Sequence, residues 1–138
     1  MEERGTHIIC ELSDCDARIL TDLKRVRSIM VAAAKEANAE ILKVAFHRFN
    51  PQGVSGVVVI AESHLSIHTW PESGYAAVDF YTCGDHTDPW RACEYAAKEL
   101  GARSMLTTEV KRGIASTNGH FTHIVHERAG QAMAKRSA

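Results

Sequence analysis

Long apolar runs, an excess of charge of one sign and paired cysteine motifs are all missing from this sequence of 138 residues. Its apolar runs fall far short of the roughly 20 residues that a membrane-spanning helix needs. The net charge is −1 with the histidines neutral, which gives no electrostatic reason to expect nucleic acid or an anionic membrane as a partner. The first residues are charged and lack the apolar core of a secretion signal. These absences favour a soluble, cytoplasmic protein.

The cysteines show no C-x-x-C spacing, the pattern typical of zinc and redox motifs. They are Cys10, Cys15, Cys83 and Cys93. In a cytoplasmic chain, such cysteines are expected to be thiols rather than a disulfide framework. Composition alone does not indicate which of them is reactive. The sequence also contains no internal repeat, no linker and no pattern typical of pyridoxal phosphate binding.

The apolar periodicity predicts the elements of one domain. Amphipathic spacing predicts helices over residues 19–37 and 89–100, with Asp88 as the N-cap and Gly101 at the end of the second. Apolar or alternating runs predict strands over residues 7–12, 41–49, 57–60, 64–70, 75–82 and 105–110. This β-α-β-β-β-β-α-β order predicts an α/β two-layer sandwich, with one mainly antiparallel sheet and two helices on one face.

Periodicity ends after Gly113. We therefore expect residues 1–114 to form a single domain and residues 115–138 to form a flexible tail. Within the domain, residues 54–85 concentrate serine, histidine and cysteine in a meander of three strands. Such a concentration of reactive side chains in so short a stretch indicates a functional site.

Strand alternation sorts the side chains of this meander onto two faces. One predicted face carries His64, Ser66, His68 and Trp70, together with Tyr75, Ala77, Asp79, Tyr81 and Cys83. A four-residue loop over 71–74 would pair Trp70 with Tyr75 and His68 with Ala77. The same register places Cys83 opposite Glu62, beside the peptide bond that joins Glu62 to Ser63.

A fold-back at residues 61–64 would place Val57 opposite His68, with Ser55 diagonal to it. Two clusters are therefore expected, Ser55 with His68 and Ser63 with Cys83. Ser63 and His68 are separated by roughly 16 Å along an extended strand, at about 3.3 Å per residue. His68 is then too far from the Ser63 of its own strand, which predicts a site shared between the two chains of a homodimer.

Three motifs in this region resemble a known family. Glu62-Ser63-His64-Leu65, His68-Thr69-Trp70-Pro71-Glu72 and Thr82-Cys83-Gly84-Asp85 are similar to the prokaryotic S-adenosylmethionine decarboxylase proenzyme, a pyruvoyl-dependent enzyme of spermidine and polyamine synthesis. The similarity is strongest over residues 46–85 and continues more loosely over 7–113. It implies a self-cleaving homodimer, with active sites at the protomer interface, that converts S-adenosylmethionine to its decarboxylated form and CO2.

The resemblance also implies individual roles. Ser63 attacks the Glu62 carbonyl, and cleavage gives a β chain (1–62) and an α chain (63–138) that begins with a pyruvoyl group, the cofactor that holds the substrate amine as a Schiff base. Ser55 and His68 match the residues that support this processing, and Cys83 matches the proton donor of decarboxylation. The substrate-binding positions implied are Phe49 for the adenine, Glu72 for the ribose hydroxyls and Glu11 near the site.

Two alternatives remain open from the sequence. Relatives of this family decarboxylate arginine or ornithine, although Phe49 and Glu72 favour a nucleoside substrate. A module without catalytic activity is the other alternative, in which His64, His68 and Cys83 chelate zinc. No fourth ligand is evident in the sequence, and no metal is expected under the decarboxylase interpretation.

Overall fold

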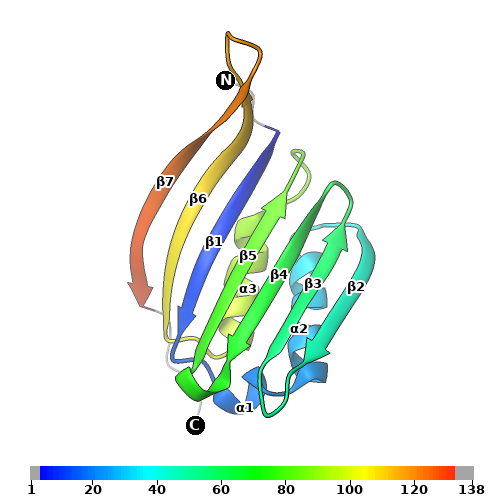
Figure 1. Ribbon diagram of the computed structural model, residues 1–138, viewed down its shortest axis with the longest axis vertical. Coiled ribbons are helices and arrows are strands. Elements are labelled where there is room, and N and C mark those ends of the chain that lie inside the picture. The colour runs from blue at the N-terminus through cyan, green and yellow to red at the C-terminus, as the bar shows by residue number, and fades with distance from the viewer. Residues whose placement is uncertain (1–3, 133–138) are drawn as a thin grey trace.

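The computed structural model of the chain describes residues 4–132 and confirms the two-layer α/β sandwich (Figure 1). Its sheet is antiparallel, with strand order β2-β3-β4-β5-β1-β6-β7. The elements are β1 (Gly5–Ser13), α1 (Ala17–Leu20), α2 (Leu23–Glu36), β2 (Ile41–Arg48), β3 (Val54–Ile60), β4 (Ser63–Trp70), the 3-10 helix η1 (Pro71–Ser73), β5 (Tyr75–Thr82), α3 (Pro89–Glu99), β6 (Ser104–Ala115) and β7 (Phe121–Ala132). The α-helices lie on one face of the sheet.

The helix expected over residues 19–37 is in fact two helices, α1 and α2. The Asp16 carboxylate caps α1 by accepting a hydrogen bond from the Arg18 amide at 3.0 Å. Asp22 caps α2 in the same way, accepting from the Arg25 amide at 3.2 Å. Each cap satisfies amide groups that a helix start leaves unpaired, so the chain restarts its helix at Leu23 instead of continuing from Ile19.

The helix expected over residues 89–100 is confirmed as α3. Asp88 accepts a hydrogen bond from the Trp90 amide at 3.0 Å, and Pro89 occupies the first helical position. Gly101, with φ 73°, follows the last turn. The face of α3 that packs on the sheet is built of small side chains, which allow close approach: Ala92, Cys93, Ala96 and Ala97.

The flexible tail expected over residues 115–138 is wrong for its greater part. Strand β6 continues to Ala115, and residues 121–132 form β7, which pairs with β6 along the sheet edge (Figure 1). Asn118 and Gly119 make the turn between them, with Gly119 at φ 83°. The observed order therefore has one more strand than expected, whereas residues 133–138 lie outside the described part of the chain.

The two faces of the sheet differ in character. The helix-covered face carries the buried core, in which Ile8, Leu65 and Phe80 are fully enclosed. The opposite face, called the open face here, carries the predicted polar set along β4 and β5. It also exposes large apolar side chains from several strands: Ile9, Val59, Trp70, Leu106 and Val125. No helix among the described residues is both long and apolar enough to cross a membrane.

Candidate active site

The turn between β3 and β4 is tight and strained. Ile60 pairs directly with Ser63, which leaves only Ala61 and Glu62 to reverse the chain. Glu62 has φ 67°, in the left-handed region usually taken by glycine. A residue with a side chain held there costs about 1–3 kcal/mol. The strain therefore lies in the residue that precedes Ser63.

The Ser63 hydroxyl is buried and, among the described residues, has no hydrogen-bond partner. Leaving a buried hydroxyl unpaired costs about 1–3 kcal/mol. Buried polar atoms in folded proteins are nearly always paired, so an unpaired hydroxyl beside a strained residue marks this turn as a candidate functional site. The bond between Glu62 and Ser63 thus joins a strained residue to a serine whose hydroxyl has no hydrogen-bond partner in the described part of the chain.

Cys83 lies where the register predicted, opposite Glu62. Its Sγ donates a hydrogen bond to the Glu62 carbonyl oxygen at 3.2 Å. The β4–β5 pairing confirms the predicted partners, Trp70 with Tyr75 and His68 with Ala77. A donor at the Glu62 oxygen is placed to stabilise negative charge there if the carbonyl carbon is attacked.

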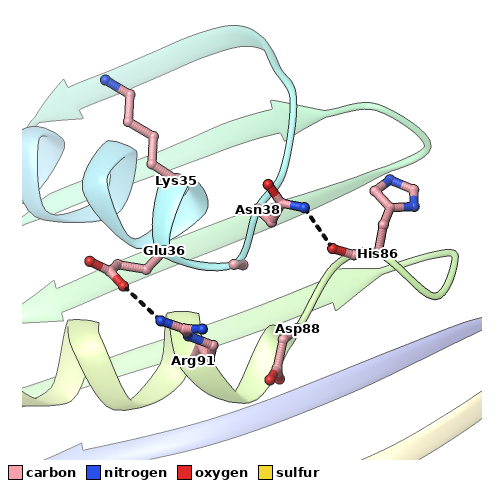
Figure 2. A pocket seen from close by; sticks show the side chains of 7 residues that line it. Lys35, Glu36, Asn38, His86, Asp88 and Arg91 are labelled. Atoms are coloured by element: carbon pink, nitrogen blue, oxygen red, sulfur yellow. Dashed lines mark hydrogen bonds and ion pairs between the residues drawn. The ribbon is translucent and has the colours of Figure 1, made fainter.

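The loop that carries Cys83 is anchored to the helical layer. The Asn38 side chain, just beyond α2, donates to the His86 carbonyl at 3.0 Å, and the Asp88 amide donates to the Ala37 carbonyl at 3.0 Å. Figure 2 shows the polar side chains that line a pocket at this seam, where Glu36 and Arg91 form an ion pair at 3.7 Å. These contacts join the backbone of His86 and Asp88 to the end of α2 and so anchor the loop that follows Cys83.

Ser55 and His68 form the second predicted cluster. Ser55 Oγ and His68 Nδ1 are 2.8 Å apart. The diagonal offset expected between them is wrong: Ser55 pairs directly with His68, and Val57 pairs with Ser66. The expected fold-back over residues 61–64 has its centre between residues 62 and 63, whereas the chain reverses one position earlier, between Ala61 and Glu62.

The candidate residues divide between opposite ends of the sheet (Figure 1). The β3–β4 turn with Ser63, and the loop after β5 with Cys83, lie at one end, called the cleavage end here. The β2–β3 turn with Phe49, and η1 with Glu72, lie at the other, called the recognition end. Ser55 and His68 belong to the recognition end, and His68 faces away from the buried side on which Ser63 lies.

The substrate-binding candidates are not gathered into one pocket. Phe49 is 47% exposed, and its ring meets His47 edge to face, with centroids 4.8 Å apart. Glu72 is exposed on η1. Glu11, near the C-terminal end of β1, accepts a hydrogen bond from the Tyr75 hydroxyl. That hydrogen bond, together with burial, raises the pKa of Tyr75 to about 12, so the phenol stays protonated.

A network centred on Asp79 was not predicted. Its Oδ2 accepts from His7 Nε2 at 2.6 Å and His64 Nε2 at 2.9 Å, and its other oxygen accepts from Ser66. Burial alone raises the pKa of Asp79, but these hydrogen bonds outweigh burial and lower the pKa to about 2. The alternation of side chains along β4 and β5 predicted that Asp79 and His64 share a face. The pairing of β1 with β5, which brings His7 to Asp79, had no signal in the local sequence.

Three atoms of this network lie close enough to hold a metal ion: one nitrogen each from His7 and His64 and one Asp79 oxygen. Arg112 opposes that use. Its Nη1 lies 3.2 Å from His7 Nδ1, and a guanidinium can only donate, so Nδ1 must accept. His7 then carries its proton on Nε2, which is the atom that a metal would need.

The zinc site considered from the sequence is not assembled. His64 contacts Asp79, His68 contacts Ser55, and Cys83 contacts the Glu62 carbonyl. His68 and Cys83 also belong to opposite ends of the sheet. The structure thus directs the three proposed ligands to three separate partners.

The fold and the site define a class: an α/β sandwich in which a serine with a buried hydroxyl follows a strained turn between two adjacent strands. The family model for S-adenosylmethionine decarboxylase matches residues 6–113. The chain belongs to the S-adenosylmethionine decarboxylase family.

Named relatives agree with this assignment. The S-adenosylmethionine decarboxylase proenzyme of Carboxydothermus hydrogenoformans is 62% identical over 114 residues, which cover 83% of this chain and 90% of that protein. The same proenzyme of Caldanaerobacter subterraneus subsp. tengcongensis is 60% identical over 114 residues, covering 83% and 92%. The crystal structure of adenosylmethionine decarboxylase from Aquifex aeolicus superposes with a TM-score of 0.71 at 32% identity, covering 100% of this chain and 99% of that one.

Proposed function

We propose that this protein is a proenzyme that cleaves its own backbone between Glu62 and Ser63 and then decarboxylates S-adenosylmethionine. Family membership supports the substrate and the decarboxylation. The observation that supports self-cleavage is the unpaired, buried Ser63 hydroxyl beside the strained Glu62, whose carbonyl oxygen accepts a hydrogen bond from Cys83.

Cleavage follows from groups on this chain. Ser63 Oγ bonds to the Glu62 carbonyl carbon as the amide C–N bond breaks, which converts the amide to an ester, and the Cys83 hydrogen bond stabilises the charge on the carbonyl oxygen. Removal of the Ser63 α proton then expels the Glu62 carboxylate. Water replaces the nitrogen of the resulting dehydroalanine, which releases ammonia and leaves a pyruvoyl group at residue 63.

The residues of the cleavage end fit a pyruvoyl group at this position. Such a group supplies the electron sink for loss of CO2, the role that pyridoxal phosphate has in other decarboxylases. Cys83 Sγ holds a proton close to residue 63 and is suited to return it to the substrate's α carbon after CO2 departs. The anchored loop of residues 84–88 keeps this thiol in place.

The working enzyme in this proposal is a homodimer. One chain cannot bring its own His68 to its own Ser63, because the two lie on opposite faces and roughly 16 Å apart along β4. Two copies packed through their open faces in opposite directions would set the recognition end of one against the cleavage end of the other. The exposed apolar side chains of that face supply surface for such an interface.

In this arrangement each end contributes its own part of the site. The partner's recognition end supplies the Ser55–His68 pair for proton transfer during cleavage. It also supplies the exposed Phe49 ring to stack on the adenine and the Glu72 carboxylate to accept from the ribose hydroxyls. Glu11, which accepts from Tyr75, lies level with His68 and Ser55 across the strands and therefore also belongs to the recognition end.

Intact mass of freshly purified protein tests the proposal. We expect two fragments, residues 1–62 and 63–138, with the second lacking a free amino group and reacting with hydrazine. Ser63→Ala is expected to remain one uncleaved chain. Wild-type protein that stays intact and ignores hydrazine would contradict self-cleavage. Turnover of S-adenosylmethionine, with little turnover of arginine or ornithine, separates this substrate from the alternatives.

A further inference from the structure

Two cysteines from distant parts of the chain face one another in the core. Cys10 on β1 and Cys93 on α3 place their sulfur atoms 2.8 Å apart. Both are enclosed, with exposed fractions of 0% and 1%. Cys93 Sγ also lies 3.5 Å from the Met105 sulfur. Neither cysteine has a part in the proposed cleavage or decarboxylation.

We propose that Cys10 and Cys93 are the site of a disulfide bond that links the two products of self-cleavage. A disulfide places its sulfurs about 2.05 Å apart, so the two atoms need to approach by less than about 1 Å. Cys10 precedes the cleaved bond and Cys93 follows it. The linking role rests on the proposed cleavage, whereas the pairing of the two sulfurs does not.

Formation of the bond requires an oxidant, for which hydrogen peroxide is sufficient. Peroxide oxidises one thiol to a sulfenic acid with release of one water, and the second thiol attacks that sulfur with release of another. Two thiols and one peroxide thus give one disulfide and two waters. The pKa of Cys10 is raised mainly by its hydrogen bond with Cys93 and, second, by its burial. The reactive thiolate is therefore scarce in the folded state. Oxidation is therefore slow and depends on local opening between α3 and β1.

The bond has a consequence that is specific to a cleaved chain. Without it, residues 1–62 and 63–138 are held together only by packing and strand pairing, and unfolding can separate them. Unfolding coupled to separation depends on protein concentration. With the bond, the two fragments remain one covalent molecule, and unfolding no longer depends on their reassociation.

Electrophoresis of processed protein provides the test. Protein is incubated with hydrogen peroxide, denatured in the presence of N-ethylmaleimide, and run with and without reductant. We expect one species of full-chain size without reductant and two fragments with it. Cys93→Ala and Cys10→Ala are each expected to give two fragments in both lanes. The matched control, Cys15→Ala, removes another buried cysteine of the 1–62 fragment and is expected to behave like wild type.

Peptide mapping of the same wild-type samples decides the pairing even if a variant fails to fold or the chain fails to cleave. A linked peptide containing Cys10 and Cys93, 2 Da lighter than the two thiol peptides together, supports the proposal. Recovery of both cysteines alkylated after peroxide overturns it. A link that persists in Cys93→Ala overturns it as well, because another cysteine would then be responsible. An uncleaved wild-type chain contradicts the proposed function, and the mapping result still stands by itself.

Discussion

The cleavage end and the recognition end of the sheet differ in how well their polar groups are satisfied. At the cleavage end, the Ser63 hydroxyl is buried without a hydrogen-bond partner among the described residues, it follows a strained residue, and Cys83 contacts the Glu62 carbonyl. At the recognition end, Ser55 and His68 are already paired, and Phe49 is exposed. The cleavage end thus contains backbone strain and an unsatisfied hydroxyl, both of which a reaction at this position would relieve. The second presents satisfied but exposed groups, which suits binding to something else, and the variants below separate these two roles.

The largest expected effect on cleavage comes from inactivating the recognition end in one chain and the cleavage end in another. His68→Ala alone should stall cleavage, because its partner then lacks the proton-transfer group. Co-expression with Ser63→Ala should restore cleavage, but only of the His68→Ala chain, which keeps its Ser63 and meets an intact His68. With random pairing, about half of the His68→Ala chains are in mixed dimers and should be cleaved. Intact mass of the two tagged chains measures this.

The control for this pair is His123→Ala, which alters an exposed histidine on β7 and should cleave normally. Cleavage of His68→Ala at the wild-type rate on its own would show that the recognition end has no part in processing. Failure of the mixture to cleave, with mixed dimers demonstrated, would show that the two ends do not meet across an interface.

The next effect isolates the chemistry of the cleavage end. Cys83→Ala should still be cleaved, more slowly, because Ser63 and the strained turn remain. Decarboxylation by the cleaved variant should fall by roughly 10²–10⁴ in kcat, the usual contribution of a positioned proton donor. Single-turnover kinetics measure this loss, with Cys15→Ala as the control. An unchanged kcat would remove Cys83 from the decarboxylation step.

Asp79 lies between the two ends, and its loss should affect stability rather than either reaction. Its pKa is about 2 in the folded chain, below the ordinary value of about 3.9. The stabilisation is therefore present above pH 4 and is lost as pH falls through 2. Asp79→Asn should lower the unfolding free energy by about 2 kcal/mol at pH 7.

Urea unfolding of the uncleaved Ser63→Ala chain, with and without Asp79→Asn, measures this difference at fixed protein concentration. The gap between the two proteins should narrow as the pH is lowered from 7 to 2. A gap that stays constant over this range would mean that the charge of Asp79 does not stabilise the fold.

The smallest expected effect belongs to the recognition end alone. Glu72→Gln removes the charge from a proposed hydrogen-bond acceptor for the ribose and should raise KM for S-adenosylmethionine roughly tenfold, with cleavage and kcat little changed. Steady-state kinetics measure this, and Glu94→Gln on the exposed side of α3 is the matched control. A fall in kcat without a change in KM would assign Glu72 to the chemistry instead.

The sequence predicted the β4–β5 register correctly but not the position of the β3–β4 turn. Pro71 and Gly74 define the β4–β5 loop, so the register that brings Cys83 to Glu62 followed from local signals. The predicted β3–β4 register was wrong by two residues, because the turn lies one position earlier than expected. A glutamate at φ 67° has no sequence signature that could have placed this turn. A left-handed glutamate is set by the surrounding strands, not by its own preference.

Two other incorrect predictions, the missing strand β7 and the undivided first helix, could have been avoided from the local sequence. Asn118-Gly119 between alternating residues is a strong hairpin signature and could have predicted β7. Asp22 is a typical N-cap and could have divided the long helix. The contacts of His7 with Asp79 and of Cys10 with Cys93 could not be found in this way, since each joins residues more than 70 positions apart.

The position of β1 in the sheet constrains the order in which folding and the proposed cleavage can occur. It belongs to the segment before the proposed cut, yet it is inserted between β5 and β6, which both come after that cut. Two separately synthesised halves would have to interleave their strands to rebuild this sheet, whereas one continuous polypeptide does so as it folds. The proposed scission would therefore have to follow folding of the sheet, and a gene split at codon 62 would encode pieces that assemble poorly.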